Sequence, residues 1–537
     1  MGKYSIGIDF GTLSARAVVV DIANGEVLAV SEMKYSHGVM SELFLNNEKL
    51  PKNFALQHPQ DYLDTMRFVV KDAIRSAKIR GEEIVGVGVD FTASTIMPVT
   101  EDGTPLCFLK KFKNRPHSYV KLWKHHAAQK EADEINVLAK NMNESWLNRY
   151  GGSISSEWMF PKIYQILKED EEIYEYTGRF IEAADWIIWQ LTGEETHSVC
   201  TAGFKAMWSK KEGYPRRMFF RRLDGRLEHI IGDKVSEHII GMDKPAGRIS
   251  KKGSELLGIK EGTPVAPAII DAHAALPSVG VVEPGSLLII IGTSSCHILL
   301  GEREVVIPGI SGVVKDGIME GYYAYEAGQA CIGDCFHWFI KNCVPYSYMA
   351  EADKNKENIH TILRKKAEKV SPGSNGLLAL DWWNGNRTPY GNADLKGIIY
   401  GLTINTKPEE IYRALIEATA YGTRQIIELY ETNGVPVKQI FAAGGIAEKD
   451  PLLLQIYADV TGREIRTAGT AQTCAHGSAI FGAVSERGYN SLAEAAKTMA
   501  KTKNTVYKPN MKNFLLYTKL YEAYKELSCY FVDRLNE

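Results

Sequence analysis

Two short stretches decide the fold: IGIDFGT at residues 6–12 and LIIIGT at residues 288–293. In each stretch an apolar run of strand length ends at a Gly-Thr turn. A second apolar run then follows, so that both stretches open with the same strand–turn–strand unit. This recurrence predicts an α/β protein made of two duplicated halves with a cleft between them.

The residues around these stretches extend the pattern. Three consecutive strands at the start of the chain do not fit a dinucleotide-binding domain, which begins with a strand–helix crossover. The turn signal Asn24-Gly25 joins the second and third strands. We expect strands over 4–10, 15–22, 26–33, 84–90, 286–291 and 296–300, and helices over 59–77, 119–140 and 514–535. A further helix is expected after the capping-box residues 406–409.

The length of 537 residues indicates more than one domain. A polar, glycine-rich stretch over 241–253 is the best candidate for the boundary. We therefore expect one domain over 1–247 and a second over 248–537.

Charge and hydropathy exclude several classes of protein. The net charge of −2 gives no electrostatic reason to expect binding to nucleic acid or to an anionic membrane. No apolar run approaches the ~18–20 residues that cross a bilayer, and no secretory signal is found at the start. We expect a cytoplasmic protein that acts on a small molecule. The sequence does not determine the oligomeric state, so a homodimer stays open.

Three glycine-containing turns are suited to holding a nucleotide. Asp9 ends a strand, and the Gly11-Thr12 turn after it aims backbone N–H groups outward, as anion-binding turns do. Asp9 would supply an oxygen ligand to magnesium. The turn 292–294 repeats this element, and the FAAGG run over 441–445 lets the backbone lie close to a flat ligand. Each turn alone also fits an ordinary hairpin or strand–helix connection.

Together these elements resemble the FGGY carbohydrate kinases, which belong to the actin/hexokinase-like ATPase superfamily. The resemblance runs from Ile6 to about Ala483. The segments that carry it are GIDFGT (7–12), GVDFTAST (88–95), VKLWKHHAAQ (120–129), GGSISSEW (151–158), DAHA (271–274), DWWNGNR (381–387) and the run 407–424. It implies two actin-like, ribonuclease H-like domains around a cleft, with ATP and Mg²⁺ as cofactors. The domain over 1–247 would then carry the sugar site and the first phosphate loop. The domain over 248–537 would carry the catalytic aspartate, the second phosphate loop and the adenosine site.

The resemblance also implies roles for particular residues. Asp271 matches the family's catalytic aspartate, which accepts the proton of the sugar hydroxyl, although an aspartate that caps a helix fits the same position. The sugar contacts match Ala93, Lys205, Asp271 and Glu326, while Lys205 and Glu326 on the surface would be the ordinary alternative. The ATP contacts match Gly11, Thr12, Ser14, Arg16, Gly292, Thr293, Gly444 and Gly445. The asparagine that often follows the last glycine pair has no match here, since Lys449 and Asp450 occupy that region.

Sequence differences from other family members narrow the range of expected substrates. Glycerol kinases carry an Arg-Glu pair where this chain has Thr92-Ala93, and xylulose kinases carry a Met-His pair in the region. The smaller, uncharged pair suits a ketopentose, and the chain is most similar to the members that phosphorylate L-ribulose. Xylulose, ribitol and gluconate remain alternatives within the family. An actin-like ATPase without sugar transfer is the alternative from another class.

Overall fold

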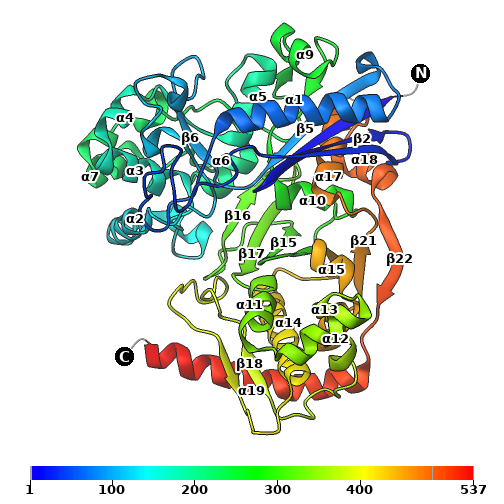
Figure 1. Ribbon diagram of the computed structural model, residues 1–537. Helices are drawn as coiled ribbons and strands as arrows, with labels where there is room; N and C mark the ends of the chain where they lie inside the picture. The colour runs from blue at the N-terminus through cyan, green and yellow to red at the C-terminus, as the bar shows by residue number, and fades with distance from the viewer. Residues whose placement is uncertain (1–2, 486–487, 536–537) are drawn as a thin grey trace.

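The computed structural model describes residues 3–485 and 488–535, so the ends of the two expected domains at 1–2 and 536–537 lie outside it. The chain forms two α/β lobes, one above the other in Figure 1. Each lobe is built on a seven-stranded sheet. Within the described residues, no helix is long and apolar enough to cross a membrane.

The sheet of the first lobe has β1 near its centre. β2 pairs with β1 and β3 with β2, both antiparallel, whereas β5 runs parallel to β1 on the other side. β12 and β13 then add to β5 in parallel, and β11 pairs with β12. The strands are β1 (Tyr4–Phe10), β2 (Ser14–Asp21), β3 (Val27–Lys34), β5 (Ile84–Phe91), β11 (Gly247–Arg248), β12 (Pro264–Val265) and β13 (Ile269–Ile270).

The sheet of the second lobe repeats this order. β15 and β17 follow β14 as antiparallel neighbours, and β20 and β21 lie parallel on its other side. β16 and β22 complete the two edges. The strands are β14 (Ser286–Ile291), β15 (Ser295–Gly301), β16 (Gly312–Lys315), β17 (Tyr323–Gln329), β20 (Gln439–Ala443), β21 (Ile465–Ala468) and β22 (Thr502–Tyr507). The order β17-β15-β14-β20-β21 thus matches β3-β2-β1-β5-β12, and the predicted duplication is confirmed.

An insertion enlarges the first lobe between β5 and β12. It supplies β6, β7 and β8 of the four-stranded sheet β4-β7-β6-β8 and most of the helices around it, whereas β4 comes from the connection between β3 and α1. The strands are β4 (Leu56–Gln57), β6 (Ile96–Val99), β7 (Val120–Lys121) and β8 (Arg179–Glu182). The helices used below are α1 (Pro59–Ser76), which precedes β5, and α2 (Gln129–Asn141), α3 (Met159–Glu169), α5 (Ala183–Thr192) and α6 (Val199–Lys205) of the insertion.

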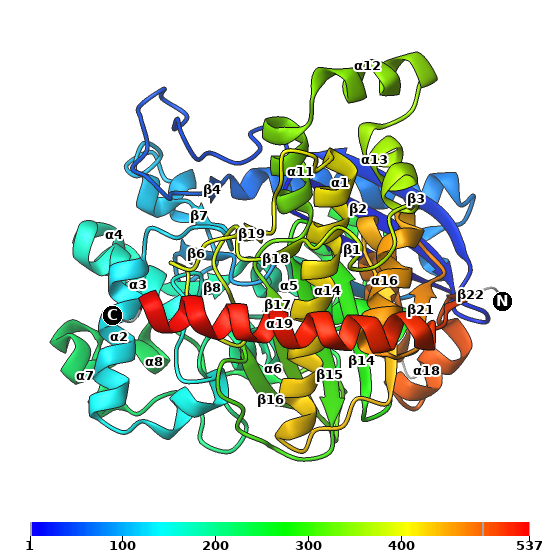
Figure 2. The same ribbon diagram turned by 90° about the horizontal axis from the view of Figure 1, so that it is seen from below.

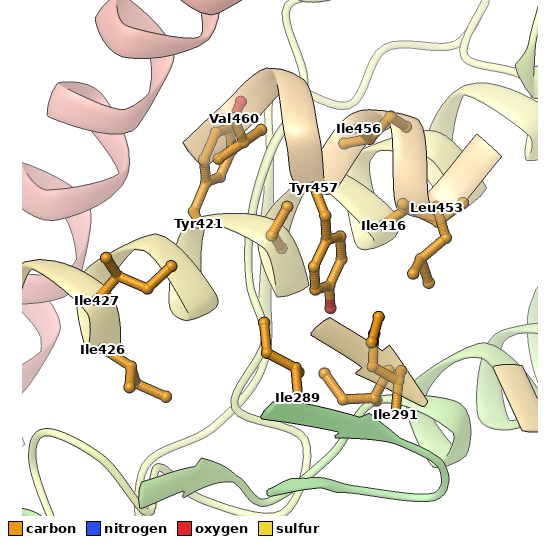
Figure 3. Packing of buried hydrophobic residues seen from close by; sticks show 14 of the residues in the cluster. Ile289, Ile291, Ile416, Tyr421, Ile426, Ile427, Leu453, Ile456, Tyr457 and Val460 are labelled. Carbon is orange, nitrogen blue, oxygen red and sulfur yellow. The ribbon is translucent and has the colours of Figure 1, made fainter. Parts of the chain in front are cut away.

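Helices α11–α16 and α19 surround the second sheet. The list is α11 (Gly333–Cys343), α12 (Tyr346–Asn355), α13 (Ile359–Ala367), α14 (Pro408–Thr432), α15 (Gly445–Lys449), α16 (Pro451–Thr461) and α19 (Met511–Leu535). Figure 2 shows α19 lying across the outer face of this lobe, where it packs against α14 and α16. Figure 3 shows how α14 and α16 close over the sheet: Ile416 and Tyr457 come from these helices and Ile289 from β14.

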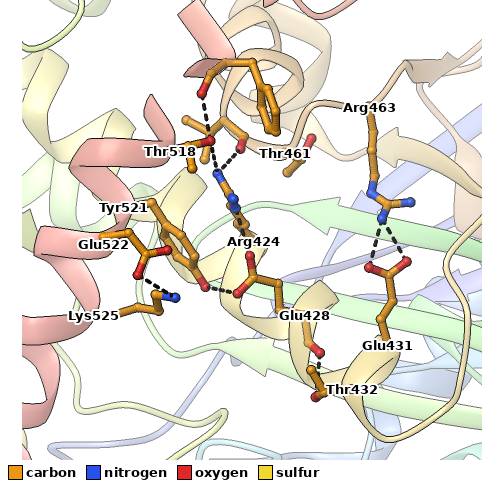
Figure 4. A network of polar contacts seen from close by, with 12 residues as sticks. Arg424, Glu428, Glu431, Thr432, Thr461, Arg463, Thr518, Tyr521, Glu522 and Lys525 are labelled. Atoms are coloured by element: carbon orange, nitrogen blue, oxygen red, sulfur yellow. Dashed lines mark hydrogen bonds and ion pairs between the residues drawn. The ribbon is translucent and has the colours of Figure 1, made fainter. Parts of the chain in front are cut away.

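A polar network fastens α19 to α14 (Figure 4). Arg424 donates to Glu428 Oε1 at 3.0 Å and to Thr518 Oγ1 at 3.1 Å. The Tyr521 hydroxyl donates to Glu428 Oε2 at 2.9 Å, and its ring lies 4.4 Å from the Arg424 guanidinium. Because the arginine bridges two helices and stacks on an aromatic ring, it combines ion pairing with packing.

The chain returns to the first lobe after β21. Helix α17 (Thr473–Ser485) packs against β1 and β5, and its orange ribbon lies beside the blue strands in Figure 1. Its backbone comes so close that a Cβ at Gly7 would lie 1.8 Å from the carbonyl oxygen of Ala475. Only glycine fits at that position of β1. Residues from the end of the chain therefore complete the lobe that its beginning started.

The first sheet extends beyond residue 247. A division after that residue would cut β11, and β12 and β13 would be separated from the sheet to which they belong. Helix α10 (Asp271–Ser278) follows directly on β13, and the second sheet begins at Ser286. We therefore propose a division between Ser278 and Ser286. On this division the glycine-rich stretch over 241–253 lies within the first lobe, because it contains β11 and the start of α9 (Lys251–Leu257).

Two expectations about helices were wrong in detail. Residues 119–128 are not helical, because Val120 and Lys121 form β7 and the backbone carbonyls of Lys121 and Leu122 accept hydrogen bonds from the buried Lys162. The helix in that segment starts only at Gln129. The capping box of α14 lies one residue later than predicted, since the Lys407 N–H donates to Glu410 Oε2 at 2.7 Å.

Candidate active site

A pair of carboxylates lies where β1 and β5 end. Asp9 stands opposite Asp90 in the parallel pairing of the two strands, and both side chains are buried. The Ser478 hydroxyl of α17 donates to Asp90 Oδ2 at 2.5 Å, while Asp90 Oδ1 has no hydrogen-bond partner. Burial raises the pKa of both carboxyl groups, and the charge of Asp9 raises that of Asp90 further.

Asp271 joins this pair from the next strand. Ile269 of β13 lies opposite Asp90, and Asp271 is the first residue of α10. Burial, followed by the charge of Asp9, raises the pKa of Asp271 to about 7. The N-cap of α10 is Ile270, so Asp271 is not the capping residue that the sequence left open; its Oδ1 accepts only from the N–H of Ala272, at 2.6 Å. Such a carboxylate is suited to exchanging a proton near neutral pH.

Lys205 and Glu326 meet across the two lobes. Lys205 ends α6 in the first lobe, and Glu326 lies in β17 of the second. Both are buried, and Lys205 Nζ donates to Glu326 Oε1 at 2.7 Å. The alternative that these two residues lie on the surface is therefore wrong. This pair also affects Asp271. The negative charge of Glu326 raises the pKa of Asp271, and the positive charge of Lys205 lowers it.

Sequence reasoning missed a third member of this cluster. His273 is fully buried in α10, two residues after Asp271, and its Nε2 lies 3.0 Å from Glu326 Oε2. The DAHA segment contains this histidine, but its sequence position alone gives no indication that it would contact a residue of β17. Cys296 and Arg387 were missed as well: Cys296 lies opposite Gly328 of β17, and a Cβ at Gly328 would lie 3.4 Å from Arg387 Nη1. Burial, then the charge of Glu326, raises the pKa of Cys296 to about 11.

Ala93 lies on the same side of the first lobe. It follows β5, is half-buried, and packs against the apolar cluster that includes Phe204 and Ile270. The next residue, Ser94, has a φ of +54°, so the chain turns sharply away after Ala93. Trp158 borders the region, with Lys205 Nζ 5.7 Å from its ring centroid. Ala93 thus brings a small, uncharged side chain to this region.

The first glycine turn connects β1 to β2. The Gly11 N–H donates to the Ser14 carbonyl at 3.0 Å, and Thr12 Oγ1 accepts from the indole N–H of Trp123 at 3.1 Å. Ser14 and Arg16 already belong to β2: the Ser14 hydroxyl donates to Glu32 Oε1 at 2.7 Å, and Arg16 Nε lies 3.5 Å from Asp9 Oδ2. Arg16 therefore places a cation directly beside the carboxylate pair.

The second turn and the glycine pair adjoin each other in the second lobe. The Gly292 N–H donates to the Ser294 carbonyl at 2.9 Å, and Thr293 is exposed. Gly444 has a φ of +98°, and a Cβ there would lie 2.5 Å from the carbonyl oxygen of Ile291. Gly445, by contrast, has open space around it and opens α15. Gly292, Thr293, Gly444 and Gly445 thus come together where β14 and β20 end.

The carboxylate pair fits a magnesium ion by its chemistry. Mg²⁺ prefers oxygen ligands and is held by one or two carboxylates together with water and substrate phosphates. Asp9 and Asp90 supply such oxygens, and among the described residues Asp90 Oδ1 has no hydrogen-bond partner. Within residues 3–485 and 488–535 no group of three or more His, Cys, Asp or Glu side chains forms a metal site by itself. The ion would therefore depend on phosphate oxygens for the rest of its ligands.

The duplicated sheets and the cleft residues define a two-lobed sugar kinase. The FGGY family model for carbohydrate kinases matches the chain over residues 4–277 with its N-terminal domain and over 287–486 with its C-terminal domain. The chain belongs to the FGGY family of carbohydrate kinases. This membership favours the kinase over the actin-like ATPase that the sequence also allowed.

Individual relatives agree with this assignment. The chain is 49% identical to a ribulokinase of Bacillus licheniformis, over 98% of this chain and 96% of that protein. It is 48% identical to a ribulokinase of Halalkalibacterium halodurans, over 100% and 96%. Among solved structures, a xylulose kinase of Lactobacillus acidophilus has the same fold, with a TM-score of 0.81, 19% identity and coverage of 98% of this chain and 97% of that chain.

Proposed function

We propose that this kinase transfers the terminal phosphate of ATP to a hydroxyl of a ketopentose, and that L-ribulose is the substrate. The observation that carries the proposal is the full-length identity of 48–49% to proteins named ribulokinase. The cleft chemistry agrees with it: a carboxylate poised to take a proton lies beside an interlobe Lys–Glu pair that suits the hydroxyls of a polyol.

Asp271 is the base in this proposal. It would accept the proton of the attacking hydroxyl as the phosphate is transferred, and its pKa of about 7 matches that role. Lys205 and Glu326 would bind the sugar through a donor and an acceptor, and Ala93 would form the uncharged wall beside them.

The glycine turns would hold ATP from both lobes. Gly11, Thr12, Ser14 and Arg16 would contact phosphate from the first lobe, and Gly292 and Thr293 from the second, with Gly444 and Gly445 against the adenosine. Asp9, together with Asp90, would bind Mg²⁺. When bound, the ion would neutralise phosphate charge during transfer.

A cytoplasmic location completes the proposal. All eight cysteines are free thiols, which is usual in a reducing compartment. The substrate is expected to be a free small molecule. A homodimer stays a proposal that measurement of the mass in solution would test.

A substrate panel tests the function. Coupled measurement of ADP release with L-ribulose, D-ribulose, xylulose, ribitol, gluconate and glycerol should give the highest kcat/KM for L-ribulose. The value should exceed those for glycerol and gluconate at least tenfold, which is about 1.4 kcal/mol of transition-state stabilisation. A higher kcat/KM for gluconate or glycerol would refute the assignment.

A further inference from the structure

Four buried side chains form a continuous polar chain across the cleft. Lys205 Nζ donates to Glu326 Oε1 at 2.7 Å, and His273 Nε2 lies 3.0 Å from Glu326 Oε2. On the other side of the imidazole, His273 Nδ1 lies 3.2 Å from Cys200 Sγ. Both oxygens of Glu326 therefore have a partner, one from α6 and one from α10, while Glu326 itself comes from β17 of the other lobe.

The proton positions in this chain follow from its electrostatics. Burial would raise the pKa of Glu326, but the charge of Lys205 and the bond to His273 outweigh burial and hold it below its usual range, so the group is a carboxylate. Burial lowers the pKa of His273, which is therefore neutral. A carboxylate can only accept, so the proton must be on Nε2 and the lone pair on Nδ1.

Cys200 lies on the Nδ1 side of the imidazole and favours the same tautomer. Burial raises the pKa of its thiol, so the S–H is retained and donates to Nδ1. The Phe204 ring, with its centroid 4.3 Å from that of the imidazole, holds the histidine from the side. Thiol and carboxylate together therefore favour one tautomer and one ring orientation.

We propose that His273 is a positioning residue for sugar recognition: it fixes the orientation of the Glu326 carboxylate, and Cys200 fixes the tautomer of His273. The proposal rests on the function proposed above, in which Glu326 accepts from sugar hydroxyls. Because His273 and Asp271 lie on the same helix, the histidine also ties the position of Glu326 to that of the proposed base. Loss of this bond would leave Glu326 held on one side only, by Lys205.

Two amide substitutions separate positioning from simple packing. In His273→Gln the amide nitrogen can take the place of Nε2 and still donate to Glu326, whereas in His273→Asn it reaches only the place of Nδ1. We expect His273→Asn to raise the KM for the sugar about 10- to 100-fold and His273→Gln to raise it less than threefold, as expected for a lost or kept hydrogen bond to a charged group. The KM for ATP should change less than twofold in both.

A second pair tests the cysteine. Cys200→Ser keeps a donor toward Nδ1 and should leave the sugar KM within twofold of the wild-type value. Cys200→Ala removes the donor and should raise it about threefold to tenfold. His297→Leu is the matched control: this histidine is also fully buried, but it faces Thr423 of α14, at 3.2 Å, and not Glu326. It should alter thermal stability without changing the sugar KM more than twofold.

The wild-type enzyme is measured first with the substrate panel, and failure to phosphorylate L-ribulose refutes the proposed function. The variants are then compared on the best sugar of the panel, so that the role of His273 is tested in either case. Equal sugar KM values for the Asn and Gln variants, or parallel changes in the KM for sugar and for ATP, would overturn the positioning role. If His273→Asn does not fold, the Cys200 pair decides: equal values for Ser and Ala overturn the proposal, and the expected difference supports it.

Discussion

The two lobes share one strand order but place different residues where their central strands end. In the first lobe Asp9 lies opposite Asp90, and β13 then leads to Asp271. At the corresponding place in the second lobe Ile290 lies opposite Ala443. The carboxylates are therefore gathered on one copy of the fold, although both copies have the same backbone arrangement.

The second lobe contributes mainly backbone at this place. Its turn after β14 and the Gly444–Gly445 pair bring main-chain groups close together, and the left-handed conformation of Gly444 makes this approach possible. The charged side chain of Glu326 comes from β17 and pairs with Lys205. The comparison teaches that duplication supplies the frame, and that single residues at strand ends make the two copies chemically different.

The prediction with the largest expected effect tests whether proton transfer depends on a residue of the first lobe. Asp271→Asn should lower kcat about 10³-fold, because it removes the proposed base, while the KM for ATP changes less than threefold. Steady-state ADP release measures both quantities. Asp316→Asn is the control, since this buried carboxylate of the second lobe accepts from Lys210 and from the Gly321 N–H, and its kcat should stay within twofold. Retention of a tenth of the wild-type kcat in Asp271→Asn would contradict the assignment.

The same carboxylate gives a pH dependence of stability. Because its pKa is raised from 3.8 to about 7 in the folded state, the native protein binds a proton there that the unfolded chain releases. The contribution of Asp271 to the free energy of unfolding therefore falls as the pH rises from about 4 to about 7. Asp271→Asn should be more stable than the wild type by about 1–4 kcal/mol at pH 8, and the two should converge near pH 4.

Urea unfolding of the ligand-free proteins at several pH values measures this difference. A constant offset between wild type and variant from pH 4 to pH 8 would show that proton binding at Asp271 does not differ between the folded and unfolded states.

The smallest effect concerns the backbone role of the second lobe. Gly444→Ala should destabilise the protein by about 1–3 kcal/mol and raise the KM for ATP, because the new Cβ would meet the Ile291 carbonyl and the φ is unfavourable for alanine. Gly445→Ala is the matched control, since a Cβ there meets nothing within 4 Å, and it should change stability by less than about 0.5 kcal/mol. Thermal unfolding and ATP kinetics compare the two. If both substitutions changed the stability and the KM for ATP equally, the special backbone role of Gly444 would be contradicted.

Local patterns determined much of the fold. Apolar runs of strand length, ended by Gly-Thr turns, predicted the first strands of both lobes, because strand period and turn preference depend on neighbouring residues. The same patterns placed Asp9, Gly11 and Gly444 at strand ends. The helix predicted over 119–140 was wrong in its first part, since the buried Lys162 draws the carbonyls of that segment into its own hydrogen bonds.

The sequence by itself determined the repeated strand–turn–strand units, the glycine turns and the candidate residues at strand ends, all of which depend on short-range preferences. Only the tertiary structure decided that α17 completes the first lobe and that Lys205, Glu326 and His273 meet. These side chains come from α6, β17 and α10, and their contacts depend on how the lobes pack. Such contacts join residues far apart in the chain, and no local preference encodes them.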